Sequence, residues 1–261
     1  MPAHRLSPTD PVPAAFAQLA TAKLVNALRG PRSDWPAAAA AIRDGAPVEF
    51  PSKPGSLSVL MRATQAGRMR LLRLLLARGA ALERADDRGR TALMHAAWFG
   101  REGAARLLLD RGAAIEARDN LGWTALVYAL SAAQTGTVRL LCARGASLVP
   151  QTASGTPLLV LAERSVECFR VLLEYGADPL TPDALGHPAL GLFTGHPEVR
   201  RDFLAVLDAV LARPERANDR RRVLSSLSPN ECRLFPRCRA IETATTRTAW
   251  QRHAGPSLTR R

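Results

Sequence analysis

The sequence predicts an all-α solenoid, in which short helical repeats stack on one another. Gly79, Gly112 and Gly145 recur with a constant 33-residue step, and each is followed by alanine. The same step recurs in five further series: Leu60, Leu93 and Leu126; Ala63, Ala96 and Ala129; Asp86 and Asp119; Gly89 and Gly122; Thr91 and Thr124. A period of this length is typical of repeat architectures, because each unit must bury its apolar face against its neighbours.

The composition is that of a folded protein whose core is built from small and aliphatic side chains. Of the 261 residues, 47% are hydrophobic, 23% are charged and only 5% are aromatic. These fractions exclude a wholly disordered or collagen-like chain. The net charge of +13 is carried almost entirely by arginine, since Lys23 and Lys53 are the only lysines. A GC-rich coding genome can produce such a skew, so the charge by itself does not indicate phosphate binding.

The clearest unit is residues 86–118, with the sequence DDRGRTALMHAAWFGREGAARLLLDRGAAIEAR. Thr91 is expected to cap a short helix whose packing side carries Leu93 and two alanines. Gly100 should separate this helix from a second one, in which leucines recur at helical spacing. Gly112 should end the second helix, because glycine adopts the left-handed conformation most easily. The expected unit is therefore a turn followed by two short helices.

This unit resembles the ankyrin repeat, whose pattern reads D-x-x-G-x-T-P-L-H-x-A-A-x-x-G and ends with L-L-x-x-G-A. It departs from that pattern at Ala92, where the family has proline, and at Met94, where the family has histidine. The resemblance implies stacked helix-turn-helix units with small alanines inside and leucines behind. It also implies that partners bind the turn tips and the exposed side of the first helices.

The resemblance extends with decreasing fidelity over residues 14–213. We expect a flexible N-terminus at 1–13 and a divergent N-terminal capping unit at 14–52, since terminal repeats have a neighbour on one side only. About five units follow, the last of them a degenerate C-terminal cap: 53–85, 86–118, 119–151, 152–182 and 183–213. In the third of these units Ala133 stands at the mid-unit glycine position, and the fourth is two residues short between its helices.

The last segment, residues 214–261, differs in character from the repeats. It holds eleven arginines against four acidic residues, and four prolines interrupt it. No repeat signature continues here, and a segment of this composition is expected to be a basic, flexible tail. The sequence leaves open whether short helices, for example over residues 221–227, form within this segment.

The sequence also bears on the compartment of the protein. Its longest apolar stretch, residues 125–133, is far shorter than the roughly 20 residues that span a bilayer. The N-terminus carries prolines where a secretory signal needs an apolar core. Four scattered cysteines are too few for a disulfide framework. We therefore expect a cytoplasmic, reducing environment, with secretion by another route left open.

No catalytic residue, metal site or cofactor is expected. The sequence contains no Gly-rich phosphate loop, no HExxH and no G-x-S-x-G. None of the five histidines lies at a recognised catalytic spacing, and His95 is expected to be structural. Cys232, Cys238 and His253 are too far apart for a typical zinc site, which favours two free thiols.

The partner site is expected on the turn tips and first helices of the two best units. Aromatic residues and arginine are favoured at the centres of interfaces. Gln65 and Asn120 hold further positions on this face, and the alternative for Trp98 is that it packs across the neighbouring helix. The predicted partner-binding residues are Arg88, Arg90, Trp98, Phe99, Leu121 and Trp123.

These expectations together favour a non-enzymatic scaffold or adaptor that binds a protein partner, with an acidic partner suited to the basic edge of the site. Two other classes stay open. One is a nucleic-acid-associated adaptor that uses the arginines of residues 214–261. The other is an effector-type protein whose stack docks a target while the tail recruits other machinery. The partner and the oligomeric state are not encoded in the pattern.

Overall fold

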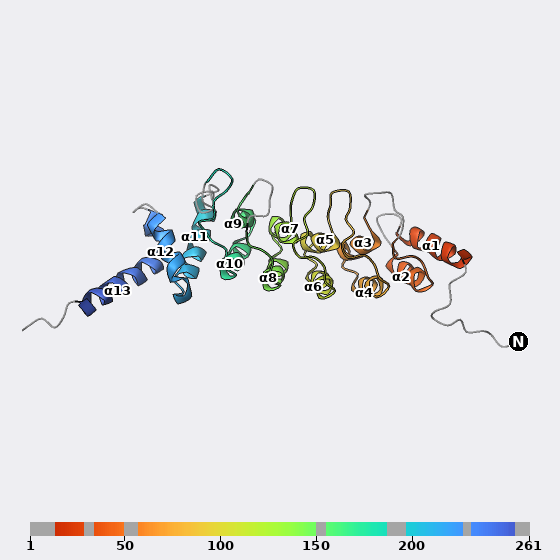
Figure 1. The fold of residues 1–261 in the computed structure, drawn as a ribbon, viewed down its shortest axis with the longest axis horizontal. Helices are drawn as coiled ribbons and strands as arrows, with labels where there is room; N and C mark the ends of the chain where they lie inside the picture. Colours follow the sequence, from red (N-terminus) through yellow and green to blue (C-terminus); the bar gives the residue numbers. More distant parts are fainter. Residues whose placement is uncertain are drawn as a thin grey trace, which may run out of the picture. The chain divides into compact units, whose positions relative to one another are not determined.

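The computed structural model describes residues 14–28, 34–49, 57–149, 155–186, 197–226 and 231–253. This part of the chain contains thirteen α-helices, which confirms the all-α fold (Figure 1). The chain divides into two compact units, Met1–Tyr128 and Ala129–Arg261. The N-terminal segment 1–13, which we expected to be flexible, lies outside the described residues.

The first unit is built from successive pairs of helices (Figure 1). The first helices α3 and α5 pack side by side, and so do the second helices α2, α4 and α6. Each pair is therefore one layer of the stack. The pairs are α1 (Ala14–Leu28) with α2 (Trp35–Arg43), α3 (Val59–Gln65) with α4 (Met69–Ala77), and α5 (Ala92–Trp98) with α6 (Glu102–Asp110), after which α7 (Ala125–Ser131) begins the next pair.

Capping residues and glycines set the ends of these short helices. Ser58 caps α3 through its Oγ, which accepts a hydrogen bond from the N–H of Met61 at 3.1 Å. Thr91 is the N-cap residue of α5, as the sequence predicted. Gly67 and Gly100 link the two helices of their pairs with φ of +65° and +61°, a conformation that costs glycine little. These short helices can therefore start and stop sharply.

The expected stacking core is largely correct. Leu109 is an exception, because it lies on the partly exposed side of α6 and is only half-buried. Buried alanines allow the first helices to approach closely, and leucines fill the space between the second helices. The expected core residues that are buried are Leu93, Ala96, Leu108, Leu126, Ala129, Leu140 and Leu141.

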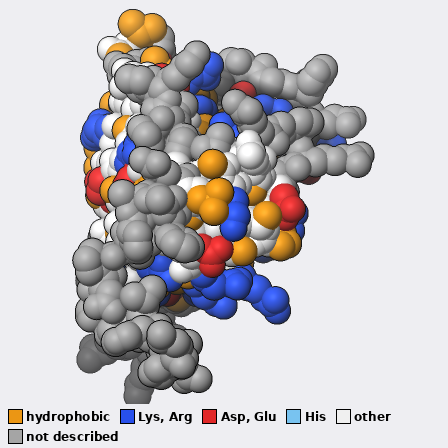
Figure 2. All heavy atoms as spheres, turned by 90° about the vertical axis from the view of Figure 1, so that its right-hand side faces the viewer, with side chains coloured by type: hydrophobic (Ala, Val, Ile, Leu, Met, Phe, Trp, Pro, Cys, Tyr) orange, Lys and Arg blue, Asp and Glu red, His pale blue; other side chains and the backbone are white. Residues whose placement is uncertain are grey.

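The N-terminal helix pair closes one end of the first unit. Ala20 and Leu24 of α1 are buried, whereas Leu19 is 55% exposed. Seen from this end, the described surface shows hydrophobic side chains interspersed with basic and acidic ones (Figure 2). A terminal repeat needs such a mixed outer face, because no further repeat covers it.

The second unit also contains helix pairs and ends in longer helices. The rings of Phe169 and Phe203 meet edge to face at 4.9 Å, which joins α10 to α11. This contact extends the apolar core beyond the last clear repeat. The helices of this unit after α7 are α8 (Thr135–Ala143), α9 (Leu158–Leu161), α10 (Val166–Glu174), α11 (Pro197–Leu211), α12 (Ala217–Ser226) and α13 (Pro236–His253).

The repeat at 152–182 has a shorter linker between its two helices, and its backbone differs locally from that of the other repeats. Its first helix, α9, spans only one turn and continues as a 3-10 helix, Ala162–Arg164. Ser165 then adopts an extended conformation, with φ of −153°, and caps α10 through its side chain. An extended serine therefore stands where a left-handed residue links α3 to α4, α5 to α6 and α7 to α8.

The structure differs from the expected flexible tail. Helices α12 and α13 both pack on α11, and Phe235 and Cys238 are buried. Arg220 is only 4% exposed, and its guanidinium donates to Glu242 Oε1 at 3.0 Å and to the carbonyl oxygen of Leu211 at 3.0 Å. The composition did not reveal this packing, because much of what is buried here is a charge pair rather than an apolar stripe.

Candidate functional site

The turns before α5 and α7 are organised by one aspartate each. Asp86 Oδ1 accepts hydrogen bonds from the N–H groups of Arg88 and Arg90, at 3.0 and 2.9 Å. Asp119 repeats this arrangement in the next unit, with N–H groups at 2.9 and 2.7 Å. Each carboxylate thus folds its turn into a fixed loop, and this role explains the aspartate of the repeat pattern.

The two turns are also joined to each other. The backbone N–H of Asn120 donates to the carbonyl oxygen of Arg88 at 3.0 Å, and its side-chain amide donates to the carbonyl oxygen of Asp87 at 3.1 Å. Gln65 bonds to His95 Nδ1 at 3.0 Å. Gln65 and Asn120, which we expected on the binding face, thus hold neighbouring repeats together.

The second oxygen of Asp86 anchors α5 to the turn. It lies 2.9 Å from the Arg90 guanidinium and 3.1 Å from His95 Nε2. His95 is 3% exposed, and burial together with the positive charge of Arg90 lowers its pKa below the ordinary value of 6.5, despite the opposing effect of Asp86. A neutral imidazole that donates to Asp86 and accepts from Gln65 fits both bonds. His95 is therefore a buried structural group, as expected.

Tyr128 takes the place of His95 in the next repeat. Its hydroxyl donates to Asp119 Oδ2 at 2.6 Å, and burial raises its pKa, with the negative Asp119 adding to the effect. The rings of Trp98 and Trp123 meet the Tyr128 ring edge to face, with centroids 5.9 and 5.4 Å away. Sequence reasoning missed Tyr128, although its position one full repeat after His95 was the available signal.

The predicted partner-binding residues differ in their exposure. Trp98 is 43% exposed, Phe99 42% and Leu121 61%. Arg88 is also exposed, whereas Trp123 is half-buried beneath its contact with Tyr128. The sixth residue, Arg90, is half-buried and paired with Asp86, so its charge is partly neutralised. Trp98 therefore packs against Tyr128 of the next repeat, as the alternative expected, and also faces solvent, while its role in partner binding stays a prediction.

Clusters of metal-ligating side chains and ionised thiols are the remaining reactive groups to consider among the described residues. No group of three histidine, cysteine or acidic side chains in the described ranges could hold a metal ion. Burial raises the pKa of the Cys142 thiol to about 11 and of the Cys238 thiol to about 12, so neither is a thiolate at neutral pH. None of the helices described is both long and apolar enough to cross a membrane.

Comparison with known proteins agrees with this architecture. A family model described as ankyrin repeats (3 copies) matches residues 36–119 and 115–183, which together make up more than half of the chain. No curated protein matches the chain. Members of the matched family are generally protein–protein interaction modules and are typically not enzymes. The matched ranges, the 33-residue period and the paired helices together show that this chain belongs to the ankyrin-repeat family.

Proposed function

We propose that this protein is a non-enzymatic scaffold that binds a protein partner through the aromatic surface formed by Arg88, Arg90, Trp98, Phe99, Leu121 and Trp123. One observation carries the proposal: Trp98 and Phe99 are adjacent large aromatics that both stay more than two-fifths exposed. Exposed apolar side chains gathered in one place are typical of interaction sites. The family supports the same class of function.

The mechanism of binding is rigid presentation. Asp86 and Asp119 fix the two turns through their hydrogen bonds, and Tyr128 holds Trp98 and Trp123 through ring contacts. A surface that is ordered before binding loses little entropy when the partner docks. The exposed cation of Arg88 favours an acidic partner and should mainly speed its encounter.

Arginines of the C-terminal segment contribute to structure, which weakens the nucleic-acid alternative. Arg216 pairs with Asp219 at 2.7 Å, and Arg222 pairs with Asp178 at 3.0 Å. Because carboxylates of the protein already partly neutralise these arginines, less positive charge is left for binding phosphate groups.

The test of the proposed function is truncation of the aromatic surface. A partner is first captured from native lysate with the full chain, and its affinity for purified variants is then measured by titration. Trp98→Ala should weaken binding by about 2 kcal/mol, which is typical of a hot-spot residue. Leu121→Ala should also weaken binding, without any cost to folding, because its side chain is 61% exposed.

A matched control for these variants is Tyr175→Ala, since Tyr175 is an aromatic residue that is 41% exposed outside the aromatic surface. It should leave binding unchanged. Loss of the Trp98–Tyr128 contact should cost only about 0.5–1.5 kcal/mol of folding free energy. If folded Trp98→Ala and Leu121→Ala both bind like the wild type, the surface has been assigned to the wrong residues.

A further inference from the structure

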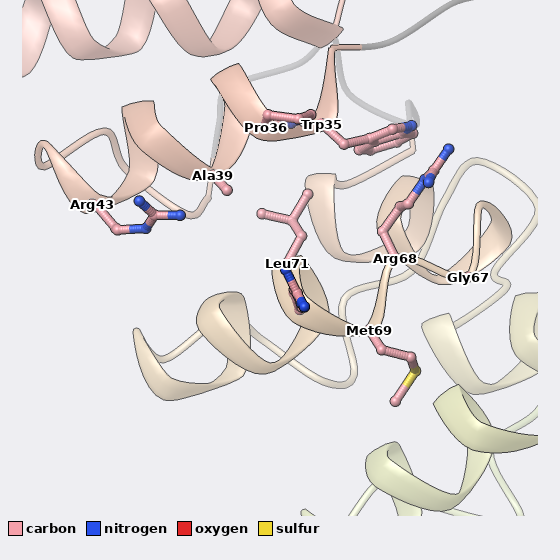
Figure 3. Close-up of a pocket in the computed structure, with 9 residues that line it drawn as sticks. Trp35, Pro36, Ala39, Arg43, Gly67, Arg68, Met69 and Leu71 are labelled. Atoms are coloured by element: carbon pink, nitrogen blue, oxygen red, sulfur yellow. The ribbon is translucent and has the colours of Figure 1, made fainter.

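A cleft in the first unit lies between α2 and the start of α4 (Figure 3). Its volume is about 430 Å³. Both helices are the second of their pairs, so the cleft shares no residue with the aromatic surface, which is built from turns and the end of a first helix. It is therefore a separate feature that the proposed function does not use.

The floor of the cleft is apolar. Leu71 is buried and points toward α2, where Ala39 faces it (Figure 3). The half-buried ring of Trp35 forms the wall beside them. A hollow of this kind accepts an aliphatic side chain, because burying it removes apolar surface from water.

Three exposed arginines surround this floor: Arg43 at the end of α2, and Arg68 and Arg70 at the start of α4. The guanidinium of Arg68 lies over the Trp35 ring, 5.8 Å from its centroid, which favours one position for this cation. None of the described residues that line the cleft is acidic. The first turn of α4 also lacks a side-chain cap, so its backbone N–H groups add to the positive potential.

Among the described residues, the side chains of these three arginines have no oxygen partner, as also holds for Arg73 and Arg111 in the same unit. Elsewhere in the first unit Arg78 donates to the carbonyl oxygen of Ile42 at 2.7 Å, and Arg90 pairs with Asp86. Within the described ranges, none of the three cleft arginines makes an ion pair or a side-chain hydrogen bond. Asp34, next to Trp35 in sequence, is engaged in capping α2. An anionic ligand would supply the missing partners.

We propose that this cleft binds an acidic peptide segment of a partner protein, in which carboxylates flank an aliphatic side chain. The aliphatic group would occupy the floor between Ala39 and Leu71, and the carboxylates would pair with the surrounding arginines. Arginine is suited to this role, because its planar guanidinium can bind a carboxylate through two parallel hydrogen bonds.

The cleft suits a peptide better than a nucleic acid. One face of the Trp35 ring is covered by Arg68, so that face is not open for stacking with a base. The floor offers aliphatic contact beside the three arginines that line the cleft. A carboxylate-bearing peptide with a leucine matches the apolar floor and the charge at once.

The test uses the full-length protein and the side-chain N–H signal of Trp35 in a ¹H–¹⁵N NMR spectrum, assigned with Trp35→Phe. The probe is the acetylated, amidated pentapeptide Glu-Glu-Leu-Glu-Glu, and the comparison probe has glutamine in place of each glutamate. The acidic peptide should shift the Trp35 signal saturably, and the neutral peptide should not. Arg43→Gln/Arg68→Gln should weaken the binding about ten-fold, since two charge-assisted contacts are lost.

Two further variants separate the cleft from general charge. Arg111→Gln/Arg118→Gln removes two exposed arginines that lie outside the cleft, in the repeat at 86–118, and should leave the affinity within about two-fold, because distant surface charges are screened. Ala39→Leu fills the floor and should weaken binding while the charge stays the same. The proposal is wrong if the acidic peptide gives no saturable shift, or if the control double variant weakens binding equally. It is also wrong if a short oligothymidylate shifts Trp35 as strongly as the peptide. None of these results bears on the aromatic surface.

Discussion

At the scale of single residues, one aspartate in each repeat connects the turn to the helix that follows. Asp86 binds two backbone N–H groups with one oxygen and His95 with the other. In the next repeat Asp119 does the same with Tyr128 as the helix partner. The two repeats therefore share a bonding scheme while the partner side chain changes from imidazole to phenol.

Gly89 lies where Asn120 of the next turn comes so close that no side chain fits. A Cβ atom at this position would lie 2.5 Å from Asn120 Oδ1 and 2.8 Å from the Asn120 backbone nitrogen. Gly89→Ala should therefore cost roughly 2–5 kcal/mol of unfolding free energy, from backbone strain at φ of +78° and from the clash. Gly112→Ala is the control, with φ of +86° but open space around it, and should cost roughly 1–2 kcal/mol. Equal losses in urea unfolding would contradict the role of the Asn120 contact.

The pair of Asp86 and His95 should make the stability of the repeat depend on pH. The pKa of His95 is lowered in the folded state, so its contribution is complete above the unfolded pKa near 6.5 and falls as the pH drops below that value. Although burial raises the pKa of Asp86, hydrogen bonds from Arg90 and Arg88 lower it overall. Its contribution is therefore present above about 3.8 and is lost only at lower pH.

His95→Gln tests this assignment, because glutamine can donate to Asp86 without titrating. Urea unfolding of the wild type should show a loss of stability between pH 7.5 and 5.5, and the variant should show a smaller loss. The other histidines are present in both proteins, so the difference between the two reports on His95. A variant that loses as much stability as the wild type over this range would show that His95 is not the titrating group.

At the scale of secondary structure, three of the four described linkers between paired helices contain a residue in the left-handed conformation. Gly67 and Gly100 adopt the left-handed conformation, and so does Ala133, with φ of +54°. Ala133 is the only described residue other than glycine with a positive φ. Ser165 avoids the conformation altogether through the shortened linker of its repeat. The sequence shows alanine at position 133, where the two preceding units have glycine. The structure shows that the backbone keeps the left-handed conformation there, which strains an alanine.

Ala133→Gly should therefore stabilise the protein by about 1 kcal/mol, because glycine removes the strain of a left-handed alanine. Ala132→Gly is the matched control, since its φ is not positive and the change only adds freedom to the unfolded chain. It should be neutral or cost up to about 1 kcal/mol. Chemical denaturation of the two variants under identical conditions measures the difference, and a destabilised Ala133→Gly would contradict the strain argument.

At the scale of the whole chain, α11 is the element on which the C-terminal helices assemble. Asp208 of α11 is 3% exposed and accepts hydrogen bonds from the backbone N–H groups of Arg237 and Cys238, at 3.1 and 3.0 Å. These groups belong to the first turn of α13, which has free N–H donors like that of every helix. A carboxylate from one helix thus caps another that begins much later in the sequence.

Asp208→Ala should release α13 from this contact. The N–H groups of Cys238, which is buried, and of Arg237, which is part-buried, would lose their partner, and the buried group left unsatisfied costs about 1–3 kcal/mol. Amide exchange at Arg237 and Cys238 should become faster, while exchange in α5 and α6 should stay as in the wild type. Asp202→Ala, at an exposed position on the same helix, should change neither. Unchanged exchange in Asp208→Ala would show that α13 is held by other contacts.

The binding residues illustrate how far sequence reasoning reaches toward a site. The period placed Trp98 and Trp123 in neighbouring repeats, which is enough to expect them near one another. It could not show that Tyr128 lies against both rings, because ring contacts depend on side-chain rotamers across the stack. It also could not show that the Arg90 guanidinium pairs with Asp86, which partly neutralises its charge.

The sequence by itself determined the repeat, its turns, its helix pairs and most of its core, because each repeat folds from local patterns and contacts its immediate neighbours. Only the tertiary structure decided the course of residues 214–226 and 231–253. There Arg220 meets Glu242 across 22 positions and Asp208 caps a helix 30 positions away. These contacts do not recur with the 33-residue repeat, because they depend on how helices far apart in the sequence pack against one another.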